Sequence, residues 1–194
     1  MGDGIAALVV MGVSGCGKSS VGAAVAALAG ARLIEGDSFH PEANIAKMSA
    51  GIPLDDKDRA GWLARLGEEM ARAIGEDARP VLTCSALKRQ YREALRAAVP
   101  GLGFVFLDLT RETAARRVAE RPGHFMPASL IESQFATLER PCGEALTLTL
   151  DATLPLPEMA RQVVEWWRVP AVFGADTAHP GVRIPAGHPV REAL

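Results

Sequence analysis

Short runs rich in apolar residues recur along the chain, and longer segments with helical character separate them. Five runs read as strands, at 5–11, 32–35, 79–84, 103–109 and 145–150. Runs of this length are typical of strands that are buried on both faces. The other segments predict helices at 19–30, 41–50, 55–74, 88–99, 110–120, 128–138 and 156–169. Strands that alternate with helices in this order predict an α/β fold with a mostly parallel sheet.

The pattern changes at about residue 169. Residues 1–169 suit a single domain, long enough to bury a core of its own. In residues 170–194, Pro and Gly recur at short intervals and preclude a regular helix. We therefore predict one domain followed by a Pro/Gly-rich C-terminal extension.

Composition narrows the classes of partner. The formal net charge is −2, from 21 Lys and Arg against 23 Asp and Glu, so we expect no nucleic-acid partner. No stretch approaches the roughly 18–20 apolar residues of a membrane span. The start, MGDG, lacks the basic region of a secretory leader, and the three Cys residues have no metal-ligand spacing. These features favour a soluble protein of the cytoplasm.

Residues 12–19 read GVSGCGKS and match the pattern G-x-x-x-x-G-K-[ST] between a predicted strand and a predicted helix. In such a P-loop, backbone N–H groups hold phosphates, the Lys reaches the β- and γ-phosphates, and the Ser hydroxyl binds Mg²⁺. We therefore predict that ATP and Mg²⁺ bind here, with Lys18 catalytic and Ser19 on the metal. The predicted nucleotide-binding residues of this segment are Gly12, Val13, Ser14, Gly15, Cys16, Gly17, Lys18, Ser19 and Ser20.

The motif alone leaves several classes of nucleotide-binding protein open. A GTPase needs an Asn-Lys-x-Asp sequence, and the one Asn of the chain, Asn44, is followed by Ile-Ala-Lys. A motor or a helicase needs a larger chain. A small kinase that transfers phosphate to a compact acceptor fits best. A nucleotide-sensing module that has lost catalysis is the alternative from a different class.

Two arginines, Arg117 and Arg121, precede the loop that begins Pro122-Gly123-His124. Arg117 and Arg121 are four residues apart and therefore share one helix face. Guanidinium groups near a Gly-containing loop suit the clamping of a transferring phosphoryl group. We predict a lid over about residues 117–138, from which both arginines act on ATP.

Polar clusters follow two of the predicted strands and open one helix. They contain Asp37 and His40 in the stretch EGDSFHPEAN at 35–44, Lys88 in CSALKR at 84–89, and Arg59 in DDKDR at 55–59. Ligands of doubly wound folds bind beyond the carboxyl ends of the strands. Carboxylate, imidazole and cationic groups together suit a negatively charged acceptor that carries several hydroxyls.

Several of these segments resemble the gluconokinase family of small P-loop kinases. They are MGVSGCGKSS (11–20), GDSFHPEANIAKMSAGIPLDDKDRAGWL (36–63), CSALKRQYREALR (84–96), RVAERPGHFMP (117–127) and SQFATLERP (133–141). The resemblance implies a five-stranded parallel sheet in the order 2-3-1-4-5 and a homodimer. It also implies ATP- and Mg²⁺-dependent phosphorylation of D-gluconate at the 6-hydroxyl, giving 6-phospho-D-gluconate and ADP.

The resemblance also implies roles for individual residues. Asp37 would accept or orient the proton of the acceptor hydroxyl and hold Mg²⁺ through water. Arg117 and Arg121 would clamp ATP from the lid. Glu35 receives no role, and Trp62 is interpreted as a packing group. Contacts to gluconate would come from Asp37, His40, Arg59, Lys88 and His124.

The chain departs from the family at two places. Gly61 stands where the family usually has Pro, and the segment after residue 169 lies outside the family's usual length. A kinase for shikimate or for a nucleoside monophosphate is the alternative in the same fold. A shikimate kinase would be expected to have Gly-Gly-Gly after the third strand, where this chain has CSALK.

Overall fold

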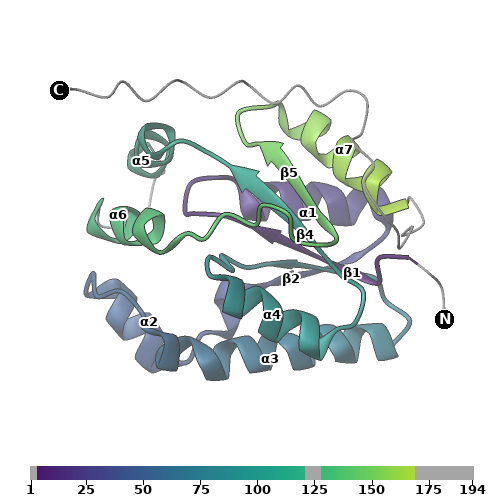
Figure 1. Cartoon of the computed structure of the whole chain (residues 1–194), viewed down its shortest axis with the longest axis horizontal. Helices are drawn as coiled ribbons and strands as arrows, with labels where there is room; N and C mark the ends of the chain where they lie inside the picture. Colours follow the sequence, from purple (N-terminus) through teal and green to yellow (C-terminus); the bar gives the residue numbers. More distant parts are fainter. Residues whose placement is uncertain (1–3, 121–127, 169–194) are drawn as a thin grey trace.

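A five-stranded sheet runs through the middle of the molecule (Figure 1), in a computed structural model that describes residues 4–120 and 128–168. The strands lie in the spatial order β2-β3-β1-β4-β5, and each neighbouring pair is parallel. The predicted sheet order is therefore confirmed. The strands are β1 (Ala7–Met11), β2 (Arg32–Glu35), β3 (Pro80–Thr83), β4 (Leu102–Asp108) and β5 (Thr147–Asp151).

Helices cover both faces of the sheet. The helices are α1 (Lys18–Ala29), α2 (Glu42–Ser49), α3 (Asp56–Gly75), α4 (Arg89–Ala98), α5 (Arg111–Ala119), α6 (Ala128–Thr137) and α7 (Leu156–Arg168). In Figure 1, α1 and α7 lie over one face, and α3 and α4 lie over the other. The helices α2, α5 and α6 lie beyond the carboxyl ends of the strands. One element was not predicted, a single 3₁₀ turn η1 (Gly36–Phe39) directly after β2.

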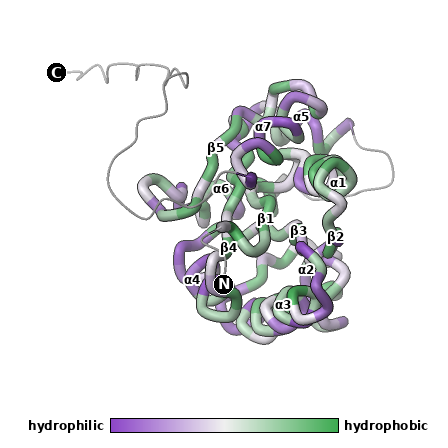
Figure 2. Tube along the Cα trace, turned by 90° about the vertical axis from the view of Figure 1, so that its right-hand side faces the viewer, coloured by the Kyte–Doolittle hydropathy of each residue, from purple (hydrophilic) through white to green (hydrophobic). Residues whose placement is uncertain are grey.

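The core is divided by the sheet into two layers, because successive side chains of a strand point to opposite faces. On β1, Leu8 and Val10 pack with α1 and α7, whereas Val9 and Met11 pack with α3 and α4. All four side chains are fully buried. Figure 2 shows the result as apolar strands in the middle and hydrophilic outer turns on α4 and α5.

The end of β3 is packed closely from two sides. A Cβ atom added to Gly22 of α1 would lie 2.6 Å from Cγ2 of Thr83, and one added to Gly36 would collide with the carbonyl oxygen of Thr83. Contacts this short do not occur between real Cβ atoms and their neighbours. The absence of side chains at both glycines therefore lets α1 and the acceptor-side turn approach the same residue.

The start of α3 is fixed by its own side chains. Asp55 accepts a hydrogen bond from the N–H of Asp58, and the Asp58 carboxylate accepts one from the N–H of Asp55. This capping box satisfies backbone donors that a helix leaves free at its N-terminus. It fixes the beginning of the helix that carries Arg59 and Trp62. Within residues 4–120 and 128–168, no helix is both long and apolar enough to cross a membrane.

Candidate active site

The candidate site lies where β1, β2 and β3 end side by side. Parallel pairing puts their carboxyl ends at one edge of the sheet. The P-loop follows β1, η1 follows β2, and the turn leading to α4 follows β3. The Gly12 N–H also donates to the carbonyl oxygen of Ser85 at 3.3 Å, which ties the first and third of these turns together. Topology thus brings the P-loop beside both predicted acceptor segments.

The P-loop turns into α1 at Gly17, which has a φ angle of 97° and is the N-cap of that helix. A positive φ of this kind favours glycine. The Lys18 ammonium donates to the carbonyl oxygen of Val13 at 3.1 Å, so it lies back over the loop. The backbone N–H groups and the ammonium form a cradle of donors suited to phosphate oxygens.

A helix distant in sequence also contacts the P-loop. The Ser14 N–H donates to Oε1 of Gln134 at 2.7 Å, and Nε2 of Gln134 donates to Oγ of Ser14 at 3.0 Å. Gln134 lies in the middle of α6 and was not among the predicted site residues. It lies in SQFATLERP, one of the segments that resemble the family, but its contact with the P-loop could not be predicted, because its partner lies 120 residues away.

Ser19 is paired with a carboxylate that the sequence analysis did not select. The Ser19 hydroxyl donates to Oε2 of Glu35 at 3.1 Å, and the Thr83 hydroxyl donates to the same oxygen at 2.6 Å. Glu35 is the last residue of β2. A carboxylate at the carboxyl end of a parallel strand is a signal by which the sequence could have identified it. Ser19 and Glu35 therefore form a pair of oxygen-bearing side chains beside the P-loop, with Asp37 two residues further along the chain.

The acceptor-side loop is held by Trp62, whose side chain is 2% exposed. The indole Nε1–H donates to the carbonyl oxygen of Gly36 at 2.9 Å, next to Asp37. The same indole lies parallel to the ring of His40 (centroids 4.1 Å apart, interplanar angle 16°). The interpretation of Trp62 as a packing group is therefore incomplete, because it also positions the backbone and ring of this loop.

His40 lies in a partly desolvated environment. Burial lowers the pKa of His40 below its ordinary value, and the Asp37 charge opposes that shift while the Arg59 charge adds to it. The Nδ1 atom of His40 is 3.4 Å from Nδ2 of Asn44, a buried amide that also donates to the carbonyl oxygen of Asp58 at 2.8 Å. A neutral imidazole is therefore favoured near neutral pH.

Two cations line the acceptor side from α3 and from the N-terminus of α4. Nε of Arg59 is buried and has no hydrogen-bond acceptor within the described parts of the chain, which is an unusual state for a guanidinium group. The Lys88 ammonium forms an ion pair with Asp56 at 2.6 Å. Hydrogen bonds from Lys88 and Tyr91 lower the pKa of Asp56 to about 2. Lys88 is thus paired within the protein, whereas Nε of Arg59 has no acceptor among the described residues.

The charges of Lys18, Asp37 and Arg59 all act on one thiol at the end of β3. Burial is the main reason that the pKa of Cys84 is raised to about 12; among the smaller effects, the Asp37 charge raises this pKa, and the Lys18 and Arg59 charges lower it. A cation of the P-loop, an exposed carboxylate of η1 and a cation of α3 therefore all act electrostatically on the end of β3.

The charge of Arg117 acts on a residue of the P-loop and on the last residue of β5. Burial raises the pKa of Cys16, against lowering effects that include the charges of Lys18 and Arg117. Hydrogen bonds from Thr153 lower the pKa of Asp151, and the Arg117 charge adds to this effect. The Arg117 charge therefore acts on the P-loop residue Cys16, and its role in a lid stays a prediction. The predicted site residues Arg121 and His124 lie outside the residues that the structure describes.

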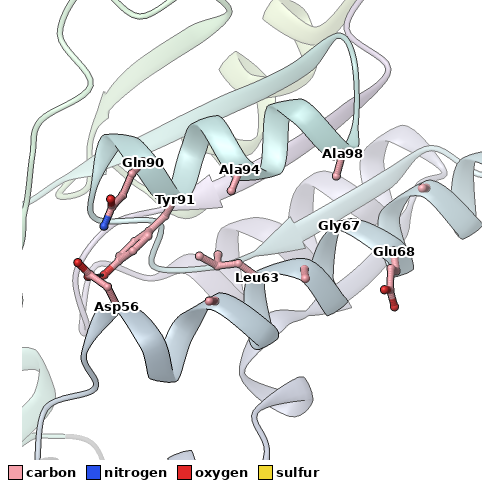
Figure 3. Close-up of a pocket in the computed structure, with 11 residues that line it drawn as sticks. Asp56, Leu63, Gly67, Glu68, Gln90, Tyr91, Ala94 and Ala98 are labelled. Atoms are coloured by element: carbon pink, nitrogen blue, oxygen red, sulfur yellow. Dashed lines mark hydrogen bonds between the residues drawn. The ribbon is translucent and has the colours of Figure 1, made fainter.

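An apolar groove lies apart from this polar site, between α3 and α4, with a cavity volume of about 640 Å³. Figure 3 shows Leu63 and Gly67 on α3 facing Ala94 and Ala98 on α4, with Asp56 and Tyr91 at one end. Its walls are mostly small apolar side chains, without the cations whose charges act on Cys84. We therefore do not regard this groove as the acceptor site.

Comparison with known proteins gives consistent matches. The family described as "AAA domain" matches residues 8–141. The thermosensitive gluconokinase of Escherichia coli (strain K12) is 48% identical over 133 residues, which are 69% of this chain and 71% of that protein. The gluconokinase of Gluconobacter oxydans (strain 621H) is 51% identical over 134 residues, 69% of this chain and 75% of that protein.

A solved structure agrees with these sequence matches. The crystal structure of a gluconokinase from Sinorhizobium meliloti 1021 has a TM-score of 0.77 and 49% sequence identity, and the match covers 84% of this chain and 91% of that one. The span from residue 8 to residue 141 contains every candidate site residue described above, from Gly12 to Gln134.

Proposed function

The chain belongs to the gluconokinase family of small P-loop kinases, and from this membership we propose that it phosphorylates D-gluconate with ATP. The transfer is to the 6-hydroxyl and gives 6-phospho-D-gluconate and ADP. The observation that carries the proposal is that parallel pairing brings the P-loop, with the Lys18 ammonium, beside the turn that carries the exposed Asp37 carboxylate, while Nε of the Arg59 guanidinium is buried without an acceptor among the described residues. These three groups supply a phosphate contact, a proton acceptor and an anchor for an anionic acceptor.

The donor half of the reaction uses the P-loop. The N–H groups of the loop and the Lys18 ammonium bind the phosphates of ATP, and the N-terminus of α1 adds positive dipole character. Arg117, whose charge acts on Cys16 of the loop, adds a second cation as negative charge develops on the transferring group. Catalysis of this kind depends on positioning and on charge stabilisation more than on covalent chemistry of the protein.

The oxygen donors around Ser19 fit Mg²⁺. This ion is usually held by one or two protein oxygens together with water and substrate phosphates. Among the described residues no group of three or more acidic, His or Cys side chains could hold a metal, so a phosphate-assisted site is the expected type. Ser19 and Glu35 would hold the ion, with Asp37 acting through water. Mg²⁺ bound there neutralises charge on the β- and γ-phosphate oxygens.

The acceptor half uses Asp37. As the oxygen at position 6 of gluconate forms its bond to the γ-phosphorus, the bond from that phosphorus to the bridging oxygen of ADP breaks. The hydroxyl proton passes to the Asp37 carboxylate. A positioned general base of this type typically contributes about 10²–10⁴-fold to the rate. Trp62 supports it by holding the carbonyl of the preceding residue, Gly36.

Gluconate is an anion with several hydroxyls, and the remaining residues suit it. Arg59 has a buried donor without an acceptor, so a substrate carboxylate or hydroxyl would satisfy it. Lys88, neutral His40 and the predicted contact His124 would bind further oxygens. Gluconate bound beside Lys88 would share the Lys88 ammonium with the Asp56 carboxylate, to which Lys88 is paired.

Four features stay predictions of the sequence. These are closure of a lid over about residues 117–138 with Arg121 in it, the separate C-terminal extension at 170–194, assembly as a homodimer, and a cytoplasmic location. Each of the four can be tested by an experiment that does not depend on catalytic activity.

A coupled assay for ADP release tests the proposed function. The purified protein with ATP and Mg²⁺ should turn over D-gluconate much faster than shikimate, glucose or AMP. Phosphorus NMR of the product should place the phosphate on the 6-position. Absence of gluconate-dependent ADP release would overturn the proposal, and faster turnover of shikimate or of AMP would assign the chain to another acceptor class.

A further inference from the structure

The contact between α6 and the P-loop has a chemical meaning beyond packing. Oε1 of Gln134 accepts from the N–H of Ser14, and Nε2 of Gln134 donates to Oγ of the same residue. A phosphate oxygen is also a hydrogen-bond acceptor, and P-loop N–H groups are the donors that it uses. The Gln134 carboxamide therefore accepts from a P-loop N–H that a phosphate oxygen would also use.

The position of Ser14 indicates which phosphate competes with Gln134. One phosphate sits on the N-terminus of α1, where the helix begins at Lys18. Ser14 lies earlier in the loop, beside Val13, the residue whose carbonyl oxygen accepts from the Lys18 ammonium. That ammonium is the group that reaches the β- and γ-phosphates. The N–H of Ser14 therefore lies toward the outer end of the phosphate chain, where a terminal γ-phosphate would be placed.

The backbone of α6 is anchored while this side chain can turn. Glu132 of the same helix pairs with Arg111 of α5 at 2.6 Å. Just beyond the helix, the Glu139 N–H donates to the carbonyl oxygen of Leu87 at 2.9 Å, and the Glu139 carboxylate accepts from the N–H of Arg89 at 2.6 Å. Gln134 itself is only half-buried. A rotation of its carboxamide needs no movement of the helix.

We propose that Gln134 is a specificity-determining residue that distinguishes nucleoside triphosphate from diphosphate. Without nucleotide, its Oε1 accepts from Ser14. When an oxygen of the γ-phosphate takes that N–H, the carboxamide turns and donates Nε2–H to the same phosphate. A carboxamide can do both, because it carries an acceptor and two donors, whereas a carboxylate has no donor. The proposal rests on ATP being the phosphate donor.

Nucleotide binding to the full-length protein tests this proposal. Isothermal titration calorimetry with Mg²⁺ would compare a non-hydrolysable ATP analogue with ADP for the wild type and for Gln134→Ala and Gln134→Glu. We expect Gln134→Ala to weaken binding of the analogue about tenfold, the range of a lost hydrogen bond to a charged group, with little change for ADP. Gln134→Glu should weaken analogue binding further, because a carboxylate repels the γ-phosphate.

Glu132→Ala is the matched control, because Glu132 lies on the same helix and its exposed ion pair contributes little. This control should bind both nucleotides like the wild type. Equal weakening for ATP analogue and ADP in Gln134→Ala, no change, or tighter analogue binding would each overturn the proposal; tighter binding would mean that Gln134 only competes with phosphate. Failure of the wild type to bind the analogue would instead overturn the proposed function.

Discussion

The imidazole of His40 lies parallel to the indole of Trp62, and the indole N–H donates to the carbonyl oxygen of Gly36. One buried side chain therefore fixes both ends of the turn that carries Asp37. The geometry of the acceptor side depends on α3 as much as on the loop itself.

Replacing Trp62 with Phe tests this dependence. The variant keeps an aromatic ring beside His40 but leaves the buried Gly36 carbonyl without its donor, which costs about 1–3 kcal/mol of the free energy of unfolding. We expect kcat/KM for gluconate to fall roughly tenfold, because a small displacement of reacting groups is costly, while ATP affinity is unchanged. Steady-state kinetics and denaturant unfolding measure both effects. Trp166→Phe, on α7, is the control; an equal loss of kcat/KM there would contradict the positioning role.

Asp37→Asn should lower kcat by about 10²–10⁴-fold, because the amide cannot accept the hydroxyl proton. The affinity for ATP should change little, since Asp37 lies on the acceptor side. Single-turnover kinetics with saturating gluconate gives the rate of the chemical step. Asp77→Asn, at the far end of α3, should behave as the wild type. Near-normal turnover by Asp37→Asn would remove this carboxylate from the role of base.

Arg59→Lys keeps the positive charge but removes the planar fork and the buried Nε donor. We expect the KM for gluconate to rise roughly tenfold, with the KM for ATP unchanged, because a hydrogen bond to a charged group is lost. The matched control is Arg65→Lys, an exposed residue of the same helix that pairs with Glu68 and Glu69. A rise in the KM for ATP instead would place Arg59 on the donor side.

Glu35→Gln tests the proposed Mg²⁺ site. The carboxylate accepts from the Ser19 hydroxyl, and groups that orient or hold a metal ligand typically contribute about 10–100-fold to metal affinity or activity. We expect the Mg²⁺ concentration for half-maximal activity to rise by about that factor at fixed ATP. Glu76→Gln, whose carboxylate pairs with Arg32 at the start of β2, is the control. An unchanged Mg²⁺ titration curve would exclude Glu35 from the metal side.

His40 should make the fold less stable in mild acid. Burial lowers its pKa in the folded protein below the ordinary value of 6.5, so the unfolded chain binds this proton more readily. The free energy of unfolding should therefore fall as pH falls from about 6.5 to the lower folded pKa. Urea unfolding at several pH values measures this slope, and His40→Gln should make it shallower. Identical slopes for the two proteins would contradict the assignment.

Much of the fold was predictable because its signals are local. The P-loop is contiguous, and apolar runs separated by capped helices define the strands. Strand ends were less well predicted: the last strand begins at Thr147 where residue 145 was expected. The 3₁₀ turn at Gly36–Phe39 was missed, because a polar sequence after a strand also suits an irregular loop.

The missed parts of the site depend on contacts between distant segments. Glu35 is recognised by its hydrogen bonds to Ser19 and Thr83, and Gln134 by a bond to a residue 120 positions away. No periodicity within a helix indicates such a partner. A hydrogen bond from Trp62 was easier to predict, because a buried indole N–H usually has an acceptor. Sequence alone does not identify that acceptor as the carbonyl beside Asp37.

The packing around Thr83 limits how the acceptor preference of this enzyme can be redesigned. Gly22 and Gly36 both lie against that residue without room for a side chain, so any substitution there would push the helix or the turn away from β3. A library aimed at new sugar acids should therefore keep positions 22, 36 and 83 constant. Diversity belongs at Arg59 and Lys88, which lie on other elements, whereas the ring of His40 packs on Trp62 and helps to hold the turn that carries Asp37.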